Sequence, residues 1–527
     1  MLLSIYKHKW KLLLLFILFN FKKHYKFILF YIYSKTKAGH AKIQDKKEKA
    51  KQIIKKDLFR TNFVHNYDKI PLYGIQNEEM DKILTDRKDN VNSRISGCLY
   101  SCDVDLEYKI KNISNKYLYS NPLHPDIYPG LIKMESEVIK MVGDLFQLPK
   151  EGGGNITTGG TESTILALKA YKKMYKSKSW FNFLKPEVLC TKTVHAAVNK
   201  ACELLDLKMV YVKLDENYIM DLNDLYWKIT PQTCVIIGSA PCFPYGLMDP
   251  ISGIAKLAKE YKIPFHVDAC LGGFITQYDV NLKITFEDNI QSISVDPHKY
   301  GLAPKGSSVL LWKDREMKKY QYFVAADWTG GLYASVSLPG SRVGSQIATS
   351  WAALLFNGNA NYKAMSRKIK GKTISFAEEL RQIPNFKVIG WPNVNVVAFY
   401  NTKYSIGQLS KYLKRQNWNI NILQNPICLH ICITPKNIKY VDMLLLAIKK
   451  FNDEHTKGVW LVWFYADWCG HCRQMAQSWG DFANNNNSGV NLAKVREEYV
   501  PRVSSKPNIQ GWPTIMLYKN GMPVDTY

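Results

Sequence analysis

The sequence predicts an α/β protein whose main domain has a mostly parallel β-sheet with helices on both faces. Its 527 residues, 46% of them hydrophobic, are enough for a large enzyme core and for more than one domain. From about residue 152, short apolar runs alternate with longer segments of helical periodicity. This alternation is typical of parallel strands joined by helices, and active sites in such sheets lie at the carboxyl ends of the strands.

The elements of this domain follow one another in a regular order. A glycine-rich loop precedes a helix over 161–175, a strand ending at Cys190 and a helix around 196–205. Strand-like and helix-like segments then alternate before two final strands, in the order MVYVKL, DLNDLYWKI, CVIIGSA, ISGIAKLAKEY, FHVDAC, SISVD and SSVLLW. Asp268 ends one of these strands and Lys299 follows another, so both are predicted at the active edge of the sheet.

The first 59 residues are basic and apolar. The formal net charge of the chain is +26, and much of it lies in 7–56, which indicates a membrane surface as the partner and not nucleic acid. The apolar runs LLLLFILFNF and FILFYIY are interrupted by lysines, and neither alone reaches the roughly 20 residues that cross a bilayer. This segment is interpreted as an irregular signal anchor, a membrane-surface helix or an uncleaved signal-like run, with a buried apolar helix as the alternative.

The 11 cysteines are mostly scattered singly, as is typical of a reducing compartment. Two close pairs of cysteines, Cys98 with Cys102 and Cys428 with Cys432, precede the only CxxC of the sequence, but nothing around these pairs resembles a metal site. No metal is therefore predicted.

Two stretches supply parts of a cofactor site. The loop TTGGTES places Gly159, Gly160 and Thr161 at a helix start, where free backbone N–H groups and the helix dipole favour a phosphate. Such a loop by itself is usually only a tight turn. His195 begins the helix after the next strand and offers a flat ring that would stack on a planar cofactor, although a histidine at a helix start is more often structural.

A carboxylate and a lysine supply the other parts. Asp268 ends its strand, where it would hold a pyridine nitrogen protonated. Lys299, in SVDPHKYG, would in isolation be interpreted as a surface lysine just past a strand. Together with the glycine-rich loop, His195 and Asp268, Lys299 is predicted to form a Schiff base with an aldehyde. The sequence therefore predicts a pyridoxal phosphate site, because a phosphate loop, a stacking ring, a carboxylate and a lysine follow one another in this order.

Several stretches within 60–451 carry a resemblance to a known family. They are SNPLHPDIYPG, TTGGTES, HAAVNKA, IPFHVDACLGGF, HKYGLAPKGSSVLLW, DWTGGLYAS and GSRVG. With them the chain resembles the sphingosine-1-phosphate lyases, within the pyridoxal phosphate group that includes the glutamate and aromatic amino-acid decarboxylases. The resemblance implies a fold-type-I pyridoxal phosphate enzyme, with a large cofactor domain and its amino-terminal arm over 60–345 and a smaller C-terminal α/β subdomain over 346–454.

The resemblance also implies an activity: retro-aldol cleavage of a phosphorylated long-chain base to a fatty aldehyde and phosphoethanolamine. It implies a homodimer with active sites at the subunit interface, anchored in the endoplasmic reticulum membrane with the catalytic domain facing the cytosol. Pro297 departs from the family, where threonine more often precedes HK, and proline occurs there in related decarboxylases. The nearest rival is therefore an amino-acid decarboxylase of the same fold, and a second rival is a non-catalytic membrane scaffold that carries a redox domain.

The resemblance assigns site residues position by position. Lys299 looks like the Schiff-base lysine, His195 like the stacking ring and Asp268 like the pyridinium partner. Contacts to the cofactor phosphate are implied at Gly159, Gly160, Thr161 and His298, and from the second subunit at Ser341. Substrate-site positions are implied at Tyr100, Asn121, His124 and Lys305. Lys305 and Tyr100 are expected near the substrate phosphate, since a cation there would fix the phosphorylated head.

Beyond residue 454 the sequence changes character. VWLVWFYADWCGHCRQM is an apolar strand that leads into a CxxC at a helix start, where the dipole lowers the pKa of the Cys469 thiol. WPT at 512–514 supplies Pro513, a proline of the kind that lies cis beside such a pair. The stretch 455–527 resembles a thioredoxin or protein disulfide isomerase domain, with Cys472 as the resolving thiol and His471 favouring the thiolate. A structural CxxC or a zinc half-site is the alternative.

This last domain is predicted to be incomplete. The chain stops at Tyr527, directly after KNGMPVDTY, where the thioredoxin family adds a last helix, so an exposed sheet face is expected. The two domains also disagree about compartment, because an isomerase works in an oxidising lumen and this type of lyase in the reducing cytosol. A joined gene model or a truncated fusion is one explanation.

Overall fold

The computed structural model describes residues 76–86 and 94–527, except 179, 181–182, 457–458, 487–489, 504, 506 and 520, together with Ala41, Asp45 and Glu48. The chain divides into two compact units, Met1–Asn90 and Val91–Tyr527. In the first unit the structure describes helix α3 (Asn77–Asp86), and the apolar runs predicted to associate with a membrane lie outside the described residues. None of the described helices is long and apolar enough to span a bilayer.

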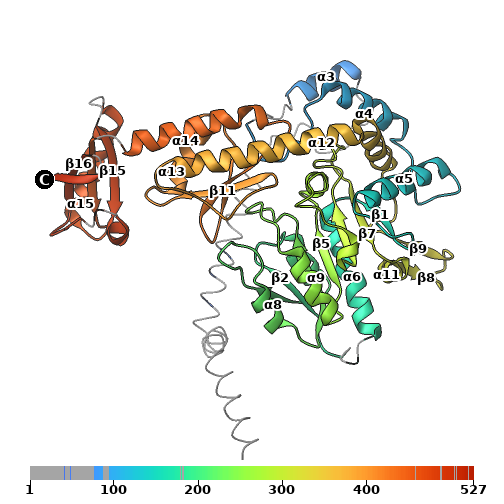
Figure 1. Cartoon of the computed structure of the whole chain (residues 1–527). Coiled ribbons are helices and arrows are strands. Elements are labelled where there is room, and N and C mark those ends of the chain that lie inside the picture. The colour runs from blue at the N-terminus through green and yellow to red at the C-terminus, as the bar shows by residue number, and fades with distance from the viewer. Residues whose placement is uncertain are drawn as a thin grey trace, which may run out of the picture. The chain divides into compact units, whose positions relative to one another are not determined.

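The second unit contains a seven-stranded sheet with the strand order β1-β7-β6-β5-β4-β2-β3 (Figure 1). Its strands are β1 (Gly153–Thr157), β2 (Glu187–Thr191), β3 (Lys208–Val212), β4 (Thr233–Ser239), β5 (Phe265–Asp268), β6 (Ser292–Val295) and β7 (Ser308–Trp312). Strands β3, β2, β4, β5 and β6 run parallel, whereas β7 pairs antiparallel with both β6 and β1. The predicted mostly parallel sheet is confirmed.

Helices cover both faces of this sheet. Helices α6 (Gly160–Lys178) and α7 (Ala197–Leu204) pack over the face that carries Val235 and Ile237, whereas α5 (Pro129–Leu145) and α9 (Ile251–Glu260) pack over the face of Ile236. Successive strand residues point to opposite faces, so the continuous apolar strands supply both layers of the core. Shorter helices are α8 (Leu222–Lys228), α10 (Gly273–Thr276) and α11 (Arg315–Lys318).

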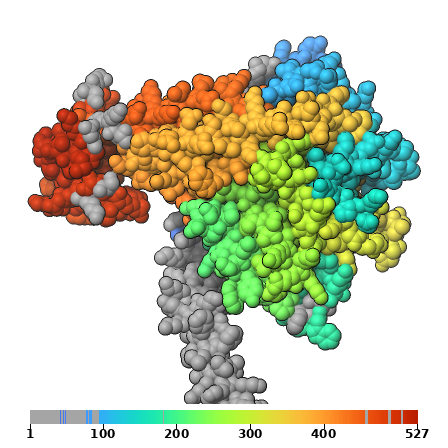
Figure 2. Space-filling model, viewed as in Figure 1, coloured from blue at the N-terminus to red at the C-terminus, as the bar shows by residue number. Residues whose placement is uncertain are grey.

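A long helix, α12 (Gly344–Gln382), links the large sheet to a smaller subdomain (Figure 1 and Figure 2). It kinks at Gly358, whose φ of 63° lies in the left-handed region that glycine adopts without strain. Its first part packs against α4 (Val104–Lys116) and α5, and its second part contributes Phe376 and Leu380 to the smaller core. The hairpin β8 (Phe323–Ala325) and β9 (Tyr333–Ser335) precedes it.

The smaller subdomain has a four-stranded antiparallel sheet of order β10-β11-β13-β12. The strands are β10 (Phe386–Val388), β11 (Val396–Asn401), β12 (Asn421–Leu423) and β13 (Cys428–Cys432), and the helices are α13 (Ile406–Arg415) and α14 (Val441–Thr456). Phe399 and Leu429 of the sheet share a buried cluster with Leu409 of α13 and Leu444 of α14. The family resemblance implied an α/β subdomain over 346–454, a range that includes nearly all of α12.

The last part of the chain has a sheet of order β15-β14-β16-β17 and one long helix, α15 (Gly470–Asn485). Its strands are β14 (Val459–Tyr465), β15 (Asn491–Arg496), β16 (Thr514–Lys519) and β17 (Met522–Thr526). The prediction of an exposed sheet face is wrong for the central strands, because Phe464, Met516 and Tyr518 are buried against Val500 and Ile509 of the segment before β16. Exposure is concentrated on the edge strand β17, all five residues of which are exposed.

Candidate active site

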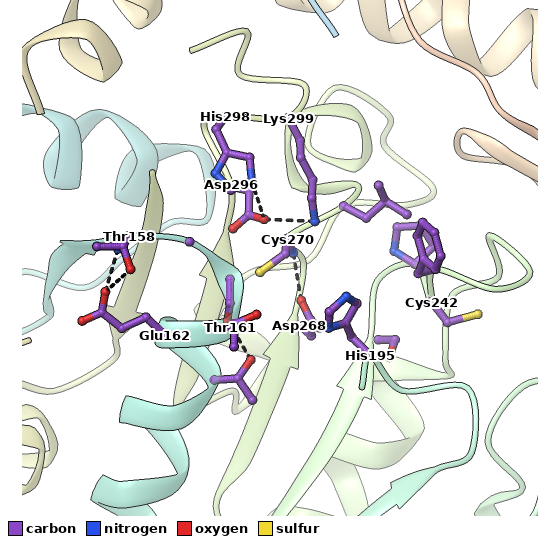
Figure 3. Close-up of a pocket in the computed structure, with 17 residues that line it drawn as sticks. Thr158, Thr161, Glu162, His195, Cys242, Asp268, Cys270, Asp296, His298 and Lys299 are labelled. Atoms are coloured by element: carbon purple, nitrogen blue, oxygen red, sulfur yellow. Dashed lines mark hydrogen bonds and ion pairs between the residues drawn. The ribbon is translucent and has the colours of Figure 1, made fainter. Parts of the chain in front are cut away.

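A cavity of about 310 Å³ opens at the carboxyl ends of β4, β5 and β6 (Figure 3). Ser239 ends β4 and Asp268 ends β5 at this edge, and Asp296 follows β6 directly. The wall contains the predicted cofactor residues Gly159, Gly160, Thr161, His195, Asp268, His298 and Lys299. Residues from separate segments of the sequence therefore meet where the strand pattern placed the active edge.

The glycine-rich loop joins β1 to α6 and forms one side of the cavity. Gly159 has a φ of 149°, which a residue with a side chain rarely adopts. A side chain at Gly160 would place its Cβ 2.8 Å from Sγ of Cys270 and 3.2 Å from both carboxylate oxygens of Asp296. The loop thus presents bare backbone at the first turn of the 19-residue helix α6, where unpaired N–H groups and the helix dipole favour an anion.

Lys299 points into the cavity and is ion-paired with Asp296 (Figure 3). Nζ of Lys299 lies 3.0 Å from Oδ2 of Asp296, and the Asp296 side chain is only 2% exposed. Burial is the largest single influence and by itself favours the neutral amine, but the Asp296 carboxylate, together with Cys270, Tyr100 and Asp268, outweighs it and holds the pKa of Lys299 above its ordinary value. Lys299 is therefore an ammonium group here, and it must lose a proton before it can attack an aldehyde.

His298 lies beside this ion pair. Its Nε2 is 3.5 Å from Oδ2 of Asp296, and its Nδ1 accepts a hydrogen bond of 3.2 Å from the N–H of Ser307. Burial lowers the pKa of His298, and the attraction of the Asp296 carboxylate offsets only part of this effect. The neutral ring with its proton on Nε2 satisfies both contacts, so His298 presents a neutral edge next to the glycine-rich loop.

His195 and Asp268 lie side by side at the opposite side of the cavity (Figure 3). Nδ1 of His195 accepts a hydrogen bond of 3.1 Å from the N–H of Ala197 at the start of α7, which fixes the ring over the cavity. Oδ1 of Asp268 accepts hydrogen bonds from the N–H of Cys270 at 3.0 Å and from Oγ of Ser294 at 3.5 Å. A flat ring and a carboxylate therefore both border the space in front of Lys299.

The predicted residues Asn121, His124 and Ser341 are not part of this cavity wall. Nδ2 of Asn121 donates to Oγ of Ser341 at 3.1 Å, and Oδ1 of Asn121 accepts from the N–H of Arg342 at 3.1 Å. The Arg342 guanidinium forms two hydrogen bonds, of 2.6 and 2.9 Å, with the two carboxylate oxygens of Glu135 on α5. Asn121 and Ser341 thus belong to a second polar cluster, which also holds the loop before α12 in place.

Lys305 and Tyr100 also lie outside the cavity wall, but they contact each other. Nζ of Lys305 lies 4.4 Å from the centroid of the Tyr100 ring, within the range of a cation–π contact. The Tyr100 ring in turn meets the Tyr300 ring edge-on, with centroids 5.0 Å apart. Tyr300 follows Lys299 in sequence, so Tyr100 and Lys305 pack next to the turn that carries the candidate Schiff-base lysine.

The CxxC has the geometry of a reactive thiol pair. Cys469 is the N-cap of α15, and its Sγ accepts a hydrogen bond of 3.2 Å from the N–H of Cys472. Sγ of Cys469 also contacts the carbonyl of Trp512 at 3.4 Å, directly before the cis bond to Pro513. Hydrogen bonds from Cys472 and from the His471 amide lower the pKa of the Cys469 thiol, whereas burial raises that of Cys472. Cys469 is thus the better nucleophile of the two.

Comparison with known proteins identifies the family. The model of the pyridoxal-dependent decarboxylase conserved domain matches residues 72–402, and the thioredoxin model matches 442–527. Sphingosine-1-phosphate lyase of Dictyostelium discoideum is 36% identical over 417 residues, which are 77% of this chain and 78% of that protein. Sphingosine-1-phosphate lyase 1 of Rattus norvegicus is 38% identical over 405 residues, 75% of this chain and 71% of that protein.

The chain belongs to the sphingosine-1-phosphate lyases, within the pyridoxal-dependent decarboxylase family. A solved lyase of this name from Burkholderia pseudomallei superimposes with a TM-score of 0.70 and 27% identity, covering 80% of this chain and 98% of that one. Glutamate decarboxylase of Lactobacillus brevis, at 19% identity and a TM-score of 0.66, covers 75% of this chain and 97% of that one and shows the shared fold. The predicted family and fold class are confirmed.

The cavity of this family member fits pyridoxal phosphate. The bare backbone at Gly160 and the start of α6 suit its phosphate, and a Cβ at this position would fill that space. Lys299 suits its aldehyde, Asp268 suits its ring nitrogen, and the His195 ring suits its flat face. One chain therefore supplies groups suited to the aldehyde, the ring nitrogen, the ring face and one side of the phosphate.

Two charged wall residues were not identified from the sequence. Asp296 stands three residues before Lys299 at the end of a buried strand, and this spacing of opposite charges is a signal that was present in SVDPHKYG. Glu162 accepts hydrogen bonds of 2.7 Å from both the N–H and the hydroxyl of Thr158, and one of 2.8 Å from the N–H of Leu338. Only the folded loop shows that Glu162 ties the phosphate side of the cavity to the segment that carries Ser341.

Proposed function

We propose that the chain is a pyridoxal phosphate-dependent carbon–carbon lyase that cleaves phosphorylated sphingoid bases to a long-chain aldehyde and phosphoethanolamine, a step of sphingolipid breakdown. The observation that carries this proposal is the single cavity that unites Lys299, Asp268 and His195 with the loop at Gly160, in a chain 36% and 38% identical to two proteins named sphingosine-1-phosphate lyase. Substrate and reaction come from those relatives, and the cavity supplies the groups that such a reaction needs.

When bound, pyridoxal phosphate supplies an aldehyde that condenses with amines and a conjugated ring that accepts the electron pair of a breaking bond. Nζ of Lys299 would hold the cofactor covalently after it has lost the proton that the Asp296 carboxylate stabilises. Asp268 would keep a proton on the ring nitrogen, where a positive charge draws electrons from the reacting carbon. His195 would hold the ring plane, and the first turn of α6 would bind the phosphate.

The phosphate of the substrate needs a cation of its own. Lys305 is a suitable one, because it lies on the loop after Lys299 and its exposed side chain is held over the Tyr100 ring. An amino-acid decarboxylase would instead need a group that seats an α-carboxylate. A cation that stands outside the cofactor cavity, as Lys305 does, suits a substrate whose charged head extends beyond the reacting carbon.

The purified protein tests this function when it is incubated with both substrate classes. Aldehyde release from a phosphorylated sphingoid base, with none from Lys299→Ala, is expected. Carbon dioxide from an amino acid, with no aldehyde from the phosphorylated base, would establish the rival decarboxylase. A protein that takes up no pyridoxal phosphate, as judged by its visible absorbance, would support a non-catalytic scaffold.

We further propose that the enzyme is a homodimer whose sites are shared between subunits. In favour of this, Ser341 is exposed and is bonded to Asn121 in a cluster apart from the cavity of its own chain. Co-expression of Lys299→Ala chains with Ser341→Trp chains is the test. Each variant alone is expected to be inactive, and mixed dimers regain one intact site only if Ser341 acts on the partner's cofactor. No recovery in mixed dimers would exclude a shared site.

We propose an endoplasmic reticulum membrane location, with the catalytic domain facing the cytosol. The support is the basic and apolar composition of the first 59 residues and the scattered cysteines of the catalytic domain. Cell fractionation of the full chain and of a chain without 1–59 tests whether this segment anchors the protein. Protease digestion of intact vesicles tests on which side of the membrane the catalytic domain lies. A full chain found only in the soluble fraction, or one protected from protease inside intact vesicles, would contradict this proposal.

A second function, thiol–disulfide exchange, is favoured by the Cys469 geometry. The Cys469 thiolate would attack a partner disulfide, and Cys472 would then displace the partner as a reduced dithiol, leaving a Cys469–Cys472 disulfide. Reduction of insulin disulfides, measured with the full chain and with Cys469→Ser, tests it. Equal rates for the two chains would refute a redox role for this pair.

A further inference from the structure

A chain of buried hydrogen bonds runs from α6 along one face of the sheet to Asp268. The Tyr171 hydroxyl of α6 is hydrogen-bonded to Oγ of Ser292, which lies 2.7 Å from Nδ1 of His266. Nε2 of His266 lies 3.3 Å from Oγ of Ser294, and that hydroxyl donates to Oδ1 of Asp268 at 3.5 Å. Tyr171, Ser292, His266 and Ser294 are each at most 1% exposed, so water does not replace the contacts among these four residues.

The register of two parallel strands builds this chain. His266 on β5 lies opposite Ser292 on β6, and Asp268 lies opposite Ser294. Residues two apart on a strand point to the same face, so the histidine, the carboxylate and both serines share the face covered by α6. Phe265 belongs to the apolar cluster beneath the other face. A polar row therefore runs through a region that is otherwise apolar.

The hydrogens of the chain have one consistent direction. An ionised Asp268 only accepts, so the Ser294 hydroxyl donates to it and must itself accept from His266 through Nε2–H. Nδ1 of His266 then accepts from the Ser292 hydroxyl, which accepts from Tyr171. Burial lowers the pKa of His266 to about 4, so the ring is neutral at pH 7 and has one donor and one acceptor, as this direction requires.

We propose that His266 is a positioning residue that orients the Ser294 hydroxyl toward Asp268 and thereby keeps this carboxylate charged opposite the ring nitrogen of the cofactor. The inference rests on the proposed function, because it assigns a task to residues behind the Asp268 site. A donated hydrogen bond favours the charged form of a carboxylate. A less supported carboxylate would take the proton from the ring nitrogen and weaken the electron sink that the reaction needs.

Other ionisable groups face the same residues. They are Tyr171 on α6, Cys234 on β4, Cys270 after β5, and His195, Asp296 and Lys299 around the cavity. His266→Phe changes none of these groups, whereas Ser294→Ala also removes a hydrogen bond to Cys270. A change in the titration of the bound cofactor that both variants share is therefore attributable to the altered chain.

The test uses the holoenzyme of His266→Phe, which keeps a flat ring without nitrogens, and of Ser294→Ala, which removes the contact to Asp268. A positive ring nitrogen disfavours protonation elsewhere on the conjugated cofactor. In both variants the visible absorption band of the cofactor is therefore expected to titrate at a pH higher by about one unit. The value of kcat is expected to fall about tenfold with KM unchanged, because only the electron sink is affected. Tyr171→Phe, at the far end, is expected to have a smaller effect.

The matched control is Ser366→Ala, which removes another buried hydroxyl, on α12, whose partner is the Ile275 carbonyl at 2.8 Å. This variant is expected to titrate like the wild type. An unchanged titration in Ser294→Ala and in any folded His266→Phe would overturn the proposal, as would an equal shift in Ser366→Ala. A wild-type protein with cofactor absorbance but no lyase activity would refute the proposed function and leave the spectral test of His266 intact.

Discussion

Lys305→Ala is the change that best separates a lyase for phosphorylated substrates from a general pyridoxal phosphate enzyme. Lys305 lies outside the cofactor cavity, whereas Lys299 lies inside it. Removing the Lys305 ammonium is therefore expected to leave the bound chromophore intact and to slow turnover of a phosphorylated sphingoid base.

The magnitude follows from the contacts that Lys305 makes. A hydrogen bond between an ammonium and a phosphate contributes about 1.5 to 3 kcal/mol, which corresponds to roughly a ten- to hundredfold loss in kcat/KM. The Tyr100 ring, 4.4 Å from Nζ, positions this group. An exposed cation–π contact contributes about 0.5 to 1 kcal/mol, so Tyr100→Leu is expected to lose roughly two- to fivefold. Tyr100→Phe keeps the ring and hence the contact.

The assay measures aldehyde release and cofactor absorbance for each variant. Lys305→Arg is expected to recover part of the activity, because the charge remains while the compact ammonium geometry is lost. Lys256→Ala is the matched control, since Lys256 is an exposed lysine on α9, away from the cavity wall. It is expected to behave like the wild type.

Two results would refute the assignment of Lys305. Loss of the cofactor in Lys305→Ala would place this lysine in the cofactor site. Unchanged cleavage of the phosphorylated base in Lys305→Ala would show that another cation binds the substrate phosphate.

Three further predictions concern other parts of the molecule. His266 stays neutral in the fold to about pH 4, against a usual pKa of 6.5, so the unfolded chain binds its proton first. Folding stability is then expected to fall by about 3 kcal/mol as the pH drops from 6.5 to 4. Thermal unfolding midpoints of the wild type and of His266→Phe across this pH range measure the loss. Equal pH dependence of the two proteins would contradict the prediction. Arg342→Met leaves Glu135 charged and buried without its partner and is expected to cost about 3 to 5 kcal/mol; the double variant with Glu135→Gln should regain much of the lost thermal stability, and no recovery would show that the pair is not coupled. Cys469 is expected to react with iodoacetamide at pH 7 faster than its buried neighbour Cys472, because the thiol pKa of Cys469 is lowered whereas that of Cys472 is raised; peptide mass spectrometry measures both rates, and slower labelling of Cys469 would contradict it.

The sequence was sufficient to predict the parts of the cofactor site. A glycine-rich loop before a helix, a carboxylate at a strand end and a lysine after the next strand are local patterns, because each depends on a few neighbouring residues and on the direction of one strand. The strand order then has to bring Gly160, Asp268 and Lys299 together, since the carboxyl ends of parallel strands share one edge. The cavity wall contains all three. The CxxC at the start of α15 is a local pattern of the same kind.

Only the tertiary structure decided which side chains support that site. Asn121 bonds to Ser341 across 220 residues of sequence, and the family resemblance had assigned them to separate roles. The exposed face expected in the last domain is largely covered because a segment before β16 folds over the central strands. His266 stands opposite Ser292 only in the register that β5 and β6 adopt. Register and long-range packing are set by the whole sheet and the helices on it, and a one-residue slip would turn every such side chain to the other face. The sequence by itself therefore determined which chemistry this protein carries, and the fold decided which buried residues hold it in place.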